Sequence, residues 1–495
     1  MASPLAAIQN PITGQTQTLK GNLALVASPQ YSSRREEQLH SLLFSPRVGL
    51  AYRAFPGTVV RTGYGISYLP ANLTQDGPQN SPINSAATTL SNTVGGQPIT
   101  SLANPFPNGI LLPAGRGPAG ITALLGQSLV GRIANQPYSY VQQYNVAVEQ
   151  AVGSNSVFSI AYAGAEGTHL TVQLGNTSTG LNLNQLPDTY QAMGPGLLTR
   201  VANPFYGILP AGTLGGPTIL TGYLLKPFPQ YQAVNQTVPR FGVSSYNALQ
   251  GTYQLRFKGG GVVGAAYTWA KLISNVDSTS GFLDGLNRIG VVQDFTNLHL
   301  EKSLSLQDVR QHLVVNYGVD LPFGRKHRYL QHSGILVNTI VGGWRANGIT
   351  SFLTGTPLSF VANPNPLSQF FGAGIIRPNR AQDCKATLDG SAQSRVTKWF
   401  NTSCFTQPAT FSFGNERRVD STLRNAGVAN FDASLSKAIK IAEVSDLQFS
   451  LEAFNLFNRV QFGTPATNLS SGTFGQVTNQ ANSPRTLQLA LRYSF

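Results

Sequence analysis

Polar and apolar residues alternate without interruption along residues 485–495. One face of this alternation carries Leu487, Leu489, Leu491, Tyr493 and Phe495, while the residues between them are small or polar. A tilted transmembrane β-strand needs about 9–11 residues with this period of two to cross a bilayer. We therefore predict that the segment is the closing strand of an outer-membrane barrel; a long strand of a soluble sandwich is the alternative.

The same period of two recurs along most of the chain. With a less regular segment at 18–27, it predicts about twelve strands, the others being at 47–54, 58–68, 140–151, 157–170, 245–257, 262–271, 310–321, 344–355, 430–440, 446–457 and 485–495. The expected fold class is all-β, an antiparallel transmembrane outer-membrane β-barrel, preceded by an N-terminal segment over 1–44.

Connections between these strands alternate between short and long. Tight turns such as Pro56-Gly57 and residues 153–155 alternate with long loops at 71–137, 171–243, 274–307, 358–428 and 458–484. Bacterial outer-membrane barrels have short periplasmic turns and long extracellular loops, whereas a sandwich has no reason to keep this order. Aromatic residues such as Tyr267 and Trp269 fall toward the expected extracellular rim, where interfacial girdles lie.

Composition is consistent with a barrel. Only 11% of the residues are charged and 41% are hydrophobic, and no run approaches the ~18 apolar residues of a membrane-spanning helix. The formal net charge is +14, but the basic residues form no continuous stripe with interleaved aromatics, so we expect no nucleic-acid partner. We assign the excess to loops and turns beside anionic lipid headgroups, or to a lumen that attracts anions.

The two cysteines, Cys384 and Cys404, lie close together in one long loop with no histidine between them. A disulfide that closes the loop is the preferred interpretation, which requires an oxidising compartment. A pair of buried free thiols is the alternative.

Strand alternation also predicts which charged residues face the lumen. These candidates are Arg61, Glu149, Arg256, Asp320, Arg345, Asp432, Glu452 and Arg492. Side chains on this face can bind a solute or a plug, or they can pair with one another across a polar wall. The second interpretation is the simpler one.

Motifs for catalysis or for cofactor binding are scarce. Gly259, Gly261 and Gly264 satisfy G-x-G-x-x-G, but a strand pattern follows them where the dinucleotide motif requires a helix, so a hairpin turn is expected. Asp308 and Arg310 sit where a long loop meets a strand, which suggests loop anchoring rather than catalysis. We predict no enzyme, no catalytic residues, no cofactor and no metal.

Four segments resemble the barrel of Oar-like TonB-dependent transporters. They are 308–324 (DVRQHLVVNYGVDLPFG), 343–357 (GWRANGITSFLTGTP), 399–401 (WFN) and 452–458 (EAFNLFN). The resemblance runs from about residue 45 to the C-terminus. It implies a barrel of twenty-two strands in the outer membrane of a Gram-negative bacterium, with a plug that contacts TonB.

Residues 1–15 carry no basic residue and two prolines, which is unlike a secretory signal, and no plug is recognisable. We therefore expect the C-terminal part of a transporter for a bulky solute, with TonB as a partner only if a plug lies upstream. The other expected partners are outer-membrane lipid and the barrel-assembly machinery, which would contact the C-terminal strand. The alternatives are a small unplugged pore and a surface anchor or adhesin.

Overall fold

The computed structural model describes the whole chain except residues 1, 22, 70–92, 95–96, 99–100, 102, 108, 172–180, 211, 237–238, 258–259, 278–291, 326–327, 371–374 and 443–444. Gly259 of the glycine motif lies outside the described residues. Gly261 and Gly264 lie at the start of an antiparallel strand, as expected for a hairpin.

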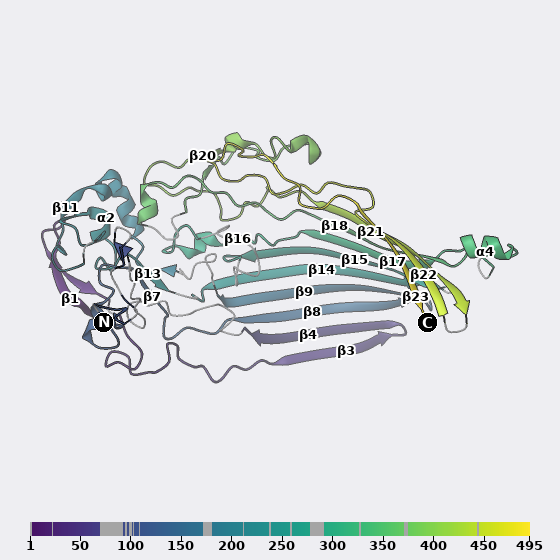
Figure 1. Cartoon of the computed structure of the whole chain (residues 1–495), viewed down its shortest axis with the longest axis horizontal. Coiled ribbons are helices and arrows are strands. Elements are labelled where there is room, and N and C mark those ends of the chain that lie inside the picture. Colours follow the sequence, from purple (N-terminus) through teal and green to yellow (C-terminus); the bar gives the residue numbers. More distant parts are fainter. Residues whose placement is uncertain are drawn as a thin grey trace.

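A twelve-stranded antiparallel sheet dominates the fold (Figure 1). Its continuous wall comprises β3 (Arg47–Phe55), β4 (Thr58–Tyr68), β8 (Tyr140–Val152), β9 (Ser156–Leu170), β14 (Gly242–Arg256), β15 (Gly261–Ser274), β17 (Gln311–Asp320), β18 (Trp344–Leu353), β21 (Val428–Ala442), β22 (Ser445–Phe454) and β23 (Thr486–Ser494). The twelfth strand, β16 (Ser303–Leu304), pairs only with the end of β15. All eleven wall strands were predicted from the period of two.

The segment 18–27 is not a wall strand, so that prediction was wrong. Its first residues belong to β2 (Thr16–Lys20), which pairs with β1 (Ala2–Gln9) in a separate hairpin. The reason is that Leu19 is fully buried against loop residues, so its hydrophobicity serves a core rather than a lipid surface. The predicted number of strands is right only because β16 takes the twelfth place.

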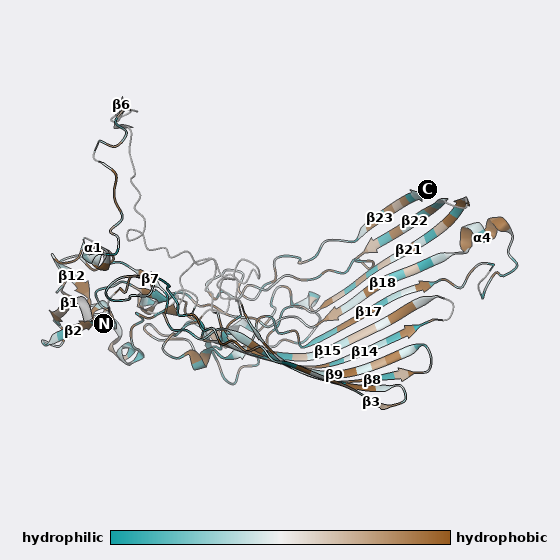
Figure 2. Cartoon of the chain, turned by 90° about the horizontal axis from the view of Figure 1, so that it is seen from below, coloured by the Kyte–Doolittle hydropathy of each residue, from teal (hydrophilic) through white to brown (hydrophobic). Residues whose placement is uncertain are grey.

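The two faces of the wall differ in polarity because residues in a strand alternate between faces. Register places Leu249 opposite both Tyr162 and Trp269, and these side chains are exposed. The other face is small or polar, as at Gln250 between Ala161 and Thr268. Figure 2 shows the resulting alternation of hydrophobic and hydrophilic bands along the strands. The apolar face fits lipid and the polar face fits the lumen.

Short and long connections lie at opposite ends of the wall (Figure 1). At the end where the C-terminus lies, β3 joins β4 through residues 56–57 and β8 joins β9 through residues 153–155. The connection 321–343 at this end contains the short helix α4 (Ile335–Val341), which the strand pattern did not predict. At the other end are the connections 69–139, 171–241, 275–310, 354–427 and 455–485.

We call the described residues of these five long connections the loop layer. Short elements within it are β5 (Thr93–Val94), β6 (Gln97–Pro98), α1 (Pro118–Thr122), β7 (Leu129–Gly131), β10 (Leu181–Asn182), η1 (Asp188–Leu198), β11 (Arg200–Ala202), β12 (Thr218–Leu220), α2 (Thr221–Leu224), β13 (Val234–Gln236), η2 (Leu298–Glu301), η3 (Pro366–Gln369), β19 (Asn379–Arg380), η4 (Gln393–Arg395), η5 (Thr402–Cys404) and β20 (Phe405–Thr406). Within the described part of the chain, no helix is long and apolar enough to span a bilayer.

The loop layer has hydrophobic cores of its own. One contains Leu19 from the N-terminal hairpin together with Phe205 and Leu224. Another contains Phe360, Phe400 and further aromatic residues, with Phe360 stacked on Phe405 at a centroid distance of 4.3 Å. Because these clusters bury large side chains away from the wall, the extracellular end is a folded body rather than a set of simple turns.

Candidate functional site

The polar face of the wall carries all eight charged residues that alternation assigned to the lumen. Two pairs of them are in contact, Arg61 Nε with Glu149 Oε1 at 3.2 Å and Arg345 with Asp320 Oδ1 at 3.2 Å. Arg345 and Asp320 are direct cross-strand partners. These four residues pair with one another, which is the simpler of the two interpretations made from the sequence.

The remaining four lumen-facing residues differ in their surroundings. Asp432 accepts hydrogen bonds from the side chain of Asn430 and from the backbone N–H of Asn455, both at 2.8 Å. Arg256, Glu452 and Arg492 have no side-chain partner among the described residues. Asp432 therefore shapes the turn that ends β22, whereas the other three residues make no such contact in the described part of the chain.

Buried ion pairs hold the loop layer to the rim of the wall. Arg418 is fully buried and forms an ion pair with Asp277. Its Nε donates to the backbone carbonyl of Glu301 at 2.8 Å, and its NH2 group donates to that of Ser274, the last residue of β15, at 2.6 Å. Arg377 forms a second buried ion pair with Glu301. A buried charge is tolerated only when it is paired and hydrogen-bonded, so these contacts fix how the loops meet the wall.

Asp308 and Arg424 form a third anchor. Asp308 Oδ1 accepts the backbone N–H of Leu272 in β15 at 2.7 Å, while Arg424 binds the other carboxylate oxygen. Arg424 also donates to the backbone carbonyl of Gly355 at 3.0 Å. The carboxylate thus joins two loops to a strand end, and this geometry suits anchoring rather than catalysis.

The segment 399–401 of the family resemblance lies in a core. Trp399 and Phe400 are buried, and the indole N–H of Trp399 donates to the carbonyl of Arg424 at 2.8 Å. Nearby, Cys384 and Cys404 are joined in a disulfide. The aromatic core and the disulfide together hold the loop 354–427 in shape.

We predict that the variant C384S/C404S lowers the free energy of unfolding of this loop by about 3 kcal/mol, because the bond closes a loop of twenty residues. Hydrogen exchange over 381–406 measures the change, with Ser403→Ala as an exposed control. Thiol labelling of the folded native protein should require prior reduction; labelling without reductant would contradict the disulfide.

Glu416 lines a cavity of roughly 310 Å³, together with Arg380 and Asp420. Burial, followed by repulsion from the Asp420 carboxylate, raises the pKa of Glu416 to about 7. Arg380 makes only long ion-pair contacts with the two carboxylates. Its Nε lies 3.9 Å from Glu416 Oε2 and 3.7 Å from Asp420 Oδ2. The Glu416 carboxyl is therefore protonated below neutral pH.

This pKa sets an expected pH dependence. Because the folded state holds a proton on Glu416 that the unfolded chain has released, local stability is fully present below the ordinary carboxyl pKa and falls as pH rises through about 7. Glu416→Gln should remove this dependence and stabilise the loop layer at pH 8 by on the order of 2 kcal/mol. Hydrogen exchange at pH 5.5 and pH 8 tests it; an unchanged pH profile in the variant would contradict the assignment.

Sequence reasoning missed the anchoring residues Asp277, Glu301, Arg377 and Arg418. The sequence held one clue to them. Charged residues are rare in this chain, and a charged residue inside an otherwise neutral loop needs a partner when it is buried. Within the described residues, no group of three His, Cys, Asp or Glu side chains is placed to hold a metal ion.

An antiparallel wall with an apolar outer face, a polar inner face and all long loops at one end defines an outer-membrane β-barrel protein. The model of the outer membrane beta barrel domain matches residues 6–488, and the chain belongs to that family. The protein is accordingly one of the Gram-negative outer membrane. No curated protein matches the chain.

Solved structures similar to the chain include three transporters or receptors. They are the outer membrane transporter YddB from Escherichia coli (8% identity, TM-score 0.38, 88% of this chain and 38% of that one), the ferric citrate transporter FecA (8%, 0.36, 91% and 38%) and the pyoverdine receptor FpvA from Pseudomonas aeruginosa (10%, 0.36, 91% and 36%). The chain therefore spans less than two-fifths of the length of each.

Proposed function

We propose that this chain supplies part of the wall and the extracellular loop layer of an Oar-like TonB-dependent transporter that takes up a bulky solute. The observation that carries the proposal is a polar inner wall beneath a folded extracellular layer. On this wall Arg256, Glu452 and Arg492 have no side-chain partner among the residues that the structure describes. Such an arrangement suits capture by the loops and passage along the lumen. A plug that contacts TonB would gate that passage.

The edges of the sheet support a larger barrel. Among the described strands, β3 and β23 each have one neighbour, and both are exposed along nearly their whole length. Since every wall pair is antiparallel, the first and the eleventh strands run in the same direction. Direct closure would create one parallel seam, whereas an odd number of added strands keeps all pairs antiparallel and gives the even total of bacterial single-chain barrels. Twenty-two strands meet this condition.

Unpaired backbone groups at these edges would cost several kcal/mol each in hydrocarbon, so the edges require partners. We infer that further strands beyond these eleven supply them.

Planar-bilayer recordings of the native protein test gating. A plugged transporter should show no steady conductance and should bind the purified periplasmic domain of TonB; a permanently open pore without such binding would refute the proposal in favour of the unplugged pore.

A surface anchor or adhesin is the second candidate, and the independent hydrophobic cores of the loop layer favour it. In that case the loops bind a surface and the barrel only holds them. Cells that make a form without residues 358–424 would then lose adhesion while solute uptake is unaffected, whereas a transporter would lose uptake.

A further inference from the structure

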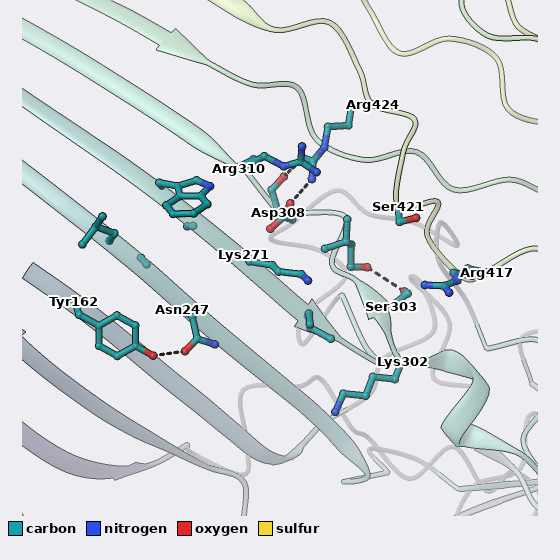
Figure 3. A pocket seen from close by; sticks show the side chains of 16 residues that line it. Tyr162, Asn247, Lys271, Lys302, Ser303, Asp308, Arg310, Arg417, Ser421 and Arg424 are labelled. Atoms are coloured by element: carbon teal, nitrogen blue, oxygen red, sulfur yellow. Dashed lines mark hydrogen bonds and ion pairs between the residues drawn. The ribbon is translucent and has the colours of Figure 1, made fainter. Parts of the chain in front are cut away.

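A cavity of about 920 Å³ opens where β9, β14 and β15 meet the loop segments 302–310 and 417–424 (Figure 3). Six of its lining residues share one face of the wall, namely Tyr162, Asn247, Leu249, Trp269, Lys271 and Ile273. Leu249 pairs with Tyr162 and with Trp269, and Asn247 pairs with Lys271. This is the apolar, lipid-facing side. Ala248 and Ala270, which also line the cavity but face the other way, are buried, so the cavity opens mainly toward the membrane at the extracellular rim.

The basic residues of the cavity lie on its loop segments and near the end of β15. Lys271, Lys302, Arg310 and Arg417 are exposed around it, and none of them forms an ion pair within the described part of the chain. Asp308 carries the one carboxylate among the described lining residues, and Arg424 already binds it. Four uncompensated positive charges around one cavity, in a chain with so few charges, create a strong local field for an anion.

The wall side of the cavity is apolar and aromatic. Trp269 is 55% exposed, and Tyr162 and Leu249 are exposed to a similar extent. The Tyr162 hydroxyl donates to Asn247 Oδ1 (Figure 3), and the Tyr162 ring lies beside the Tyr144 ring at a centroid distance of 6.2 Å. Exposed Trp and Tyr side chains on a barrel mark the level where acyl chains meet headgroups.

An occupant of this cavity must therefore carry negative charge near the rim and apolar chains below it. A water-soluble anion would use the basic residues but would gain nothing from the outward-facing aromatic surface. We propose that the cavity binds the phosphate-bearing headgroup of a glycolipid in the outer leaflet. The bound headgroup would bridge β15 to the loop segments 302–310 and 417–424, so that outer-leaflet lipid becomes part of the anchorage of the loop layer. This inference does not depend on what the protein transports.

Binding of diphosphoryl lipid A to the delipidated native protein in detergent, measured by native mass spectrometry, tests the proposal. The triple variant K271Q/K302Q/R417Q should weaken binding at least about tenfold, because each basic residue near a lipid surface adds to the attraction of anionic headgroups. The matched control R34Q/R116Q/K398Q removes the same charge from exposed residues that do not line the cavity, and it should bind within about twofold of the wild type.

Inorganic phosphate and a dephosphorylated lipid A are the remaining probes. The wild-type protein should prefer diphosphoryl lipid A to the dephosphorylated form, and inorganic phosphate at the same concentration should not displace it. If the triple variant does not fold, the single variants Lys271→Gln and Arg417→Gln should each weaken binding about threefold. Equal binding by the triple variant and the wild type, or displacement by inorganic phosphate, would overturn the proposal.

Discussion

Replacing Arg418 with methionine is expected to lower the free energy of opening of the loop layer by about 3–5 kcal/mol. The guanidinium is fully buried and pairs with Asp277, and it also donates to the carbonyls of Glu301 and Ser274. Methionine leaves the Asp277 carboxylate buried without its countercharge and leaves both carbonyls without this donor. A buried charge that has lost its partner costs far more than the pair contributed.

Native-state hydrogen exchange over residues 293–306 and 358–424 measures this loss. The substitution Lys398→Met in the same long loop is the control, because Lys398 is exposed and does not line the cavity, and its loss should change stability by no more than about 0.5 kcal/mol. Protection in the Arg418→Met protein equal to that in the control would show that the buried pair does not hold the loops to β15.

Introducing lysine at Ile160 is expected to destabilise the wall by about 2–4 kcal/mol, whereas lysine at Ala161 is expected to be tolerated. Ile160 lies near the middle of β9 on the exposed apolar face, opposite Val148 and Gly251. Ala161 is the next residue and faces the other side, between Ala147 and Gln250. A charge on the lipid side must leave water, but one on the lumen side need not.

Urea titration of refolding into lipid vesicles measures both variants under the same conditions. The comparison is sharp because the two substitutions add the same side chain one residue apart in the same strand. An equal cost for both, or a larger cost at Ala161, would mean that the faces are assigned the wrong way round.

The wall could be predicted from the sequence because its signal is local. A period of two, interrupted by turns rich in Gly, Pro and Asn, predicts a strand and also the face of the sheet on which each side chain lies. It therefore predicted correctly that residues as distant in sequence as Arg61 and Arg492 share one face. The ends of strands were less accurate at the loop layer. β14 begins at Gly242 rather than near 245, because Gly242 pairs with Leu170 beyond a register shift and extends the ladder past the regular pattern.

Loop anchoring was expected at Asp308, but the buried anchors Arg377 and Arg418 could not be predicted, because their partners are far apart in sequence. Arg418 and Asp277 are separated by 141 residues, and nothing in the neighbourhood of either residue identifies the other. Leu19 illustrates the same limit, since alternation near it resembled a wall strand. Its side chain instead packs in a core that combines N-terminal residues such as Ile8 with residues beyond position 120 such as Phe205. Periodicity predicts the face of the sheet on which a side chain lies, but it does not predict which long loops pack together.

The intact mass of the native protein in purified outer membranes tests most directly whether these strands belong to a larger barrel. This chain has a mass of 52.8 kDa. We expect a considerably heavier species that carries these peptides, because the two parallel edge strands require an odd number of further strands between them. A species of 52.8 kDa that resists SDS until it is boiled would contradict this account, since these eleven strands would then close by themselves.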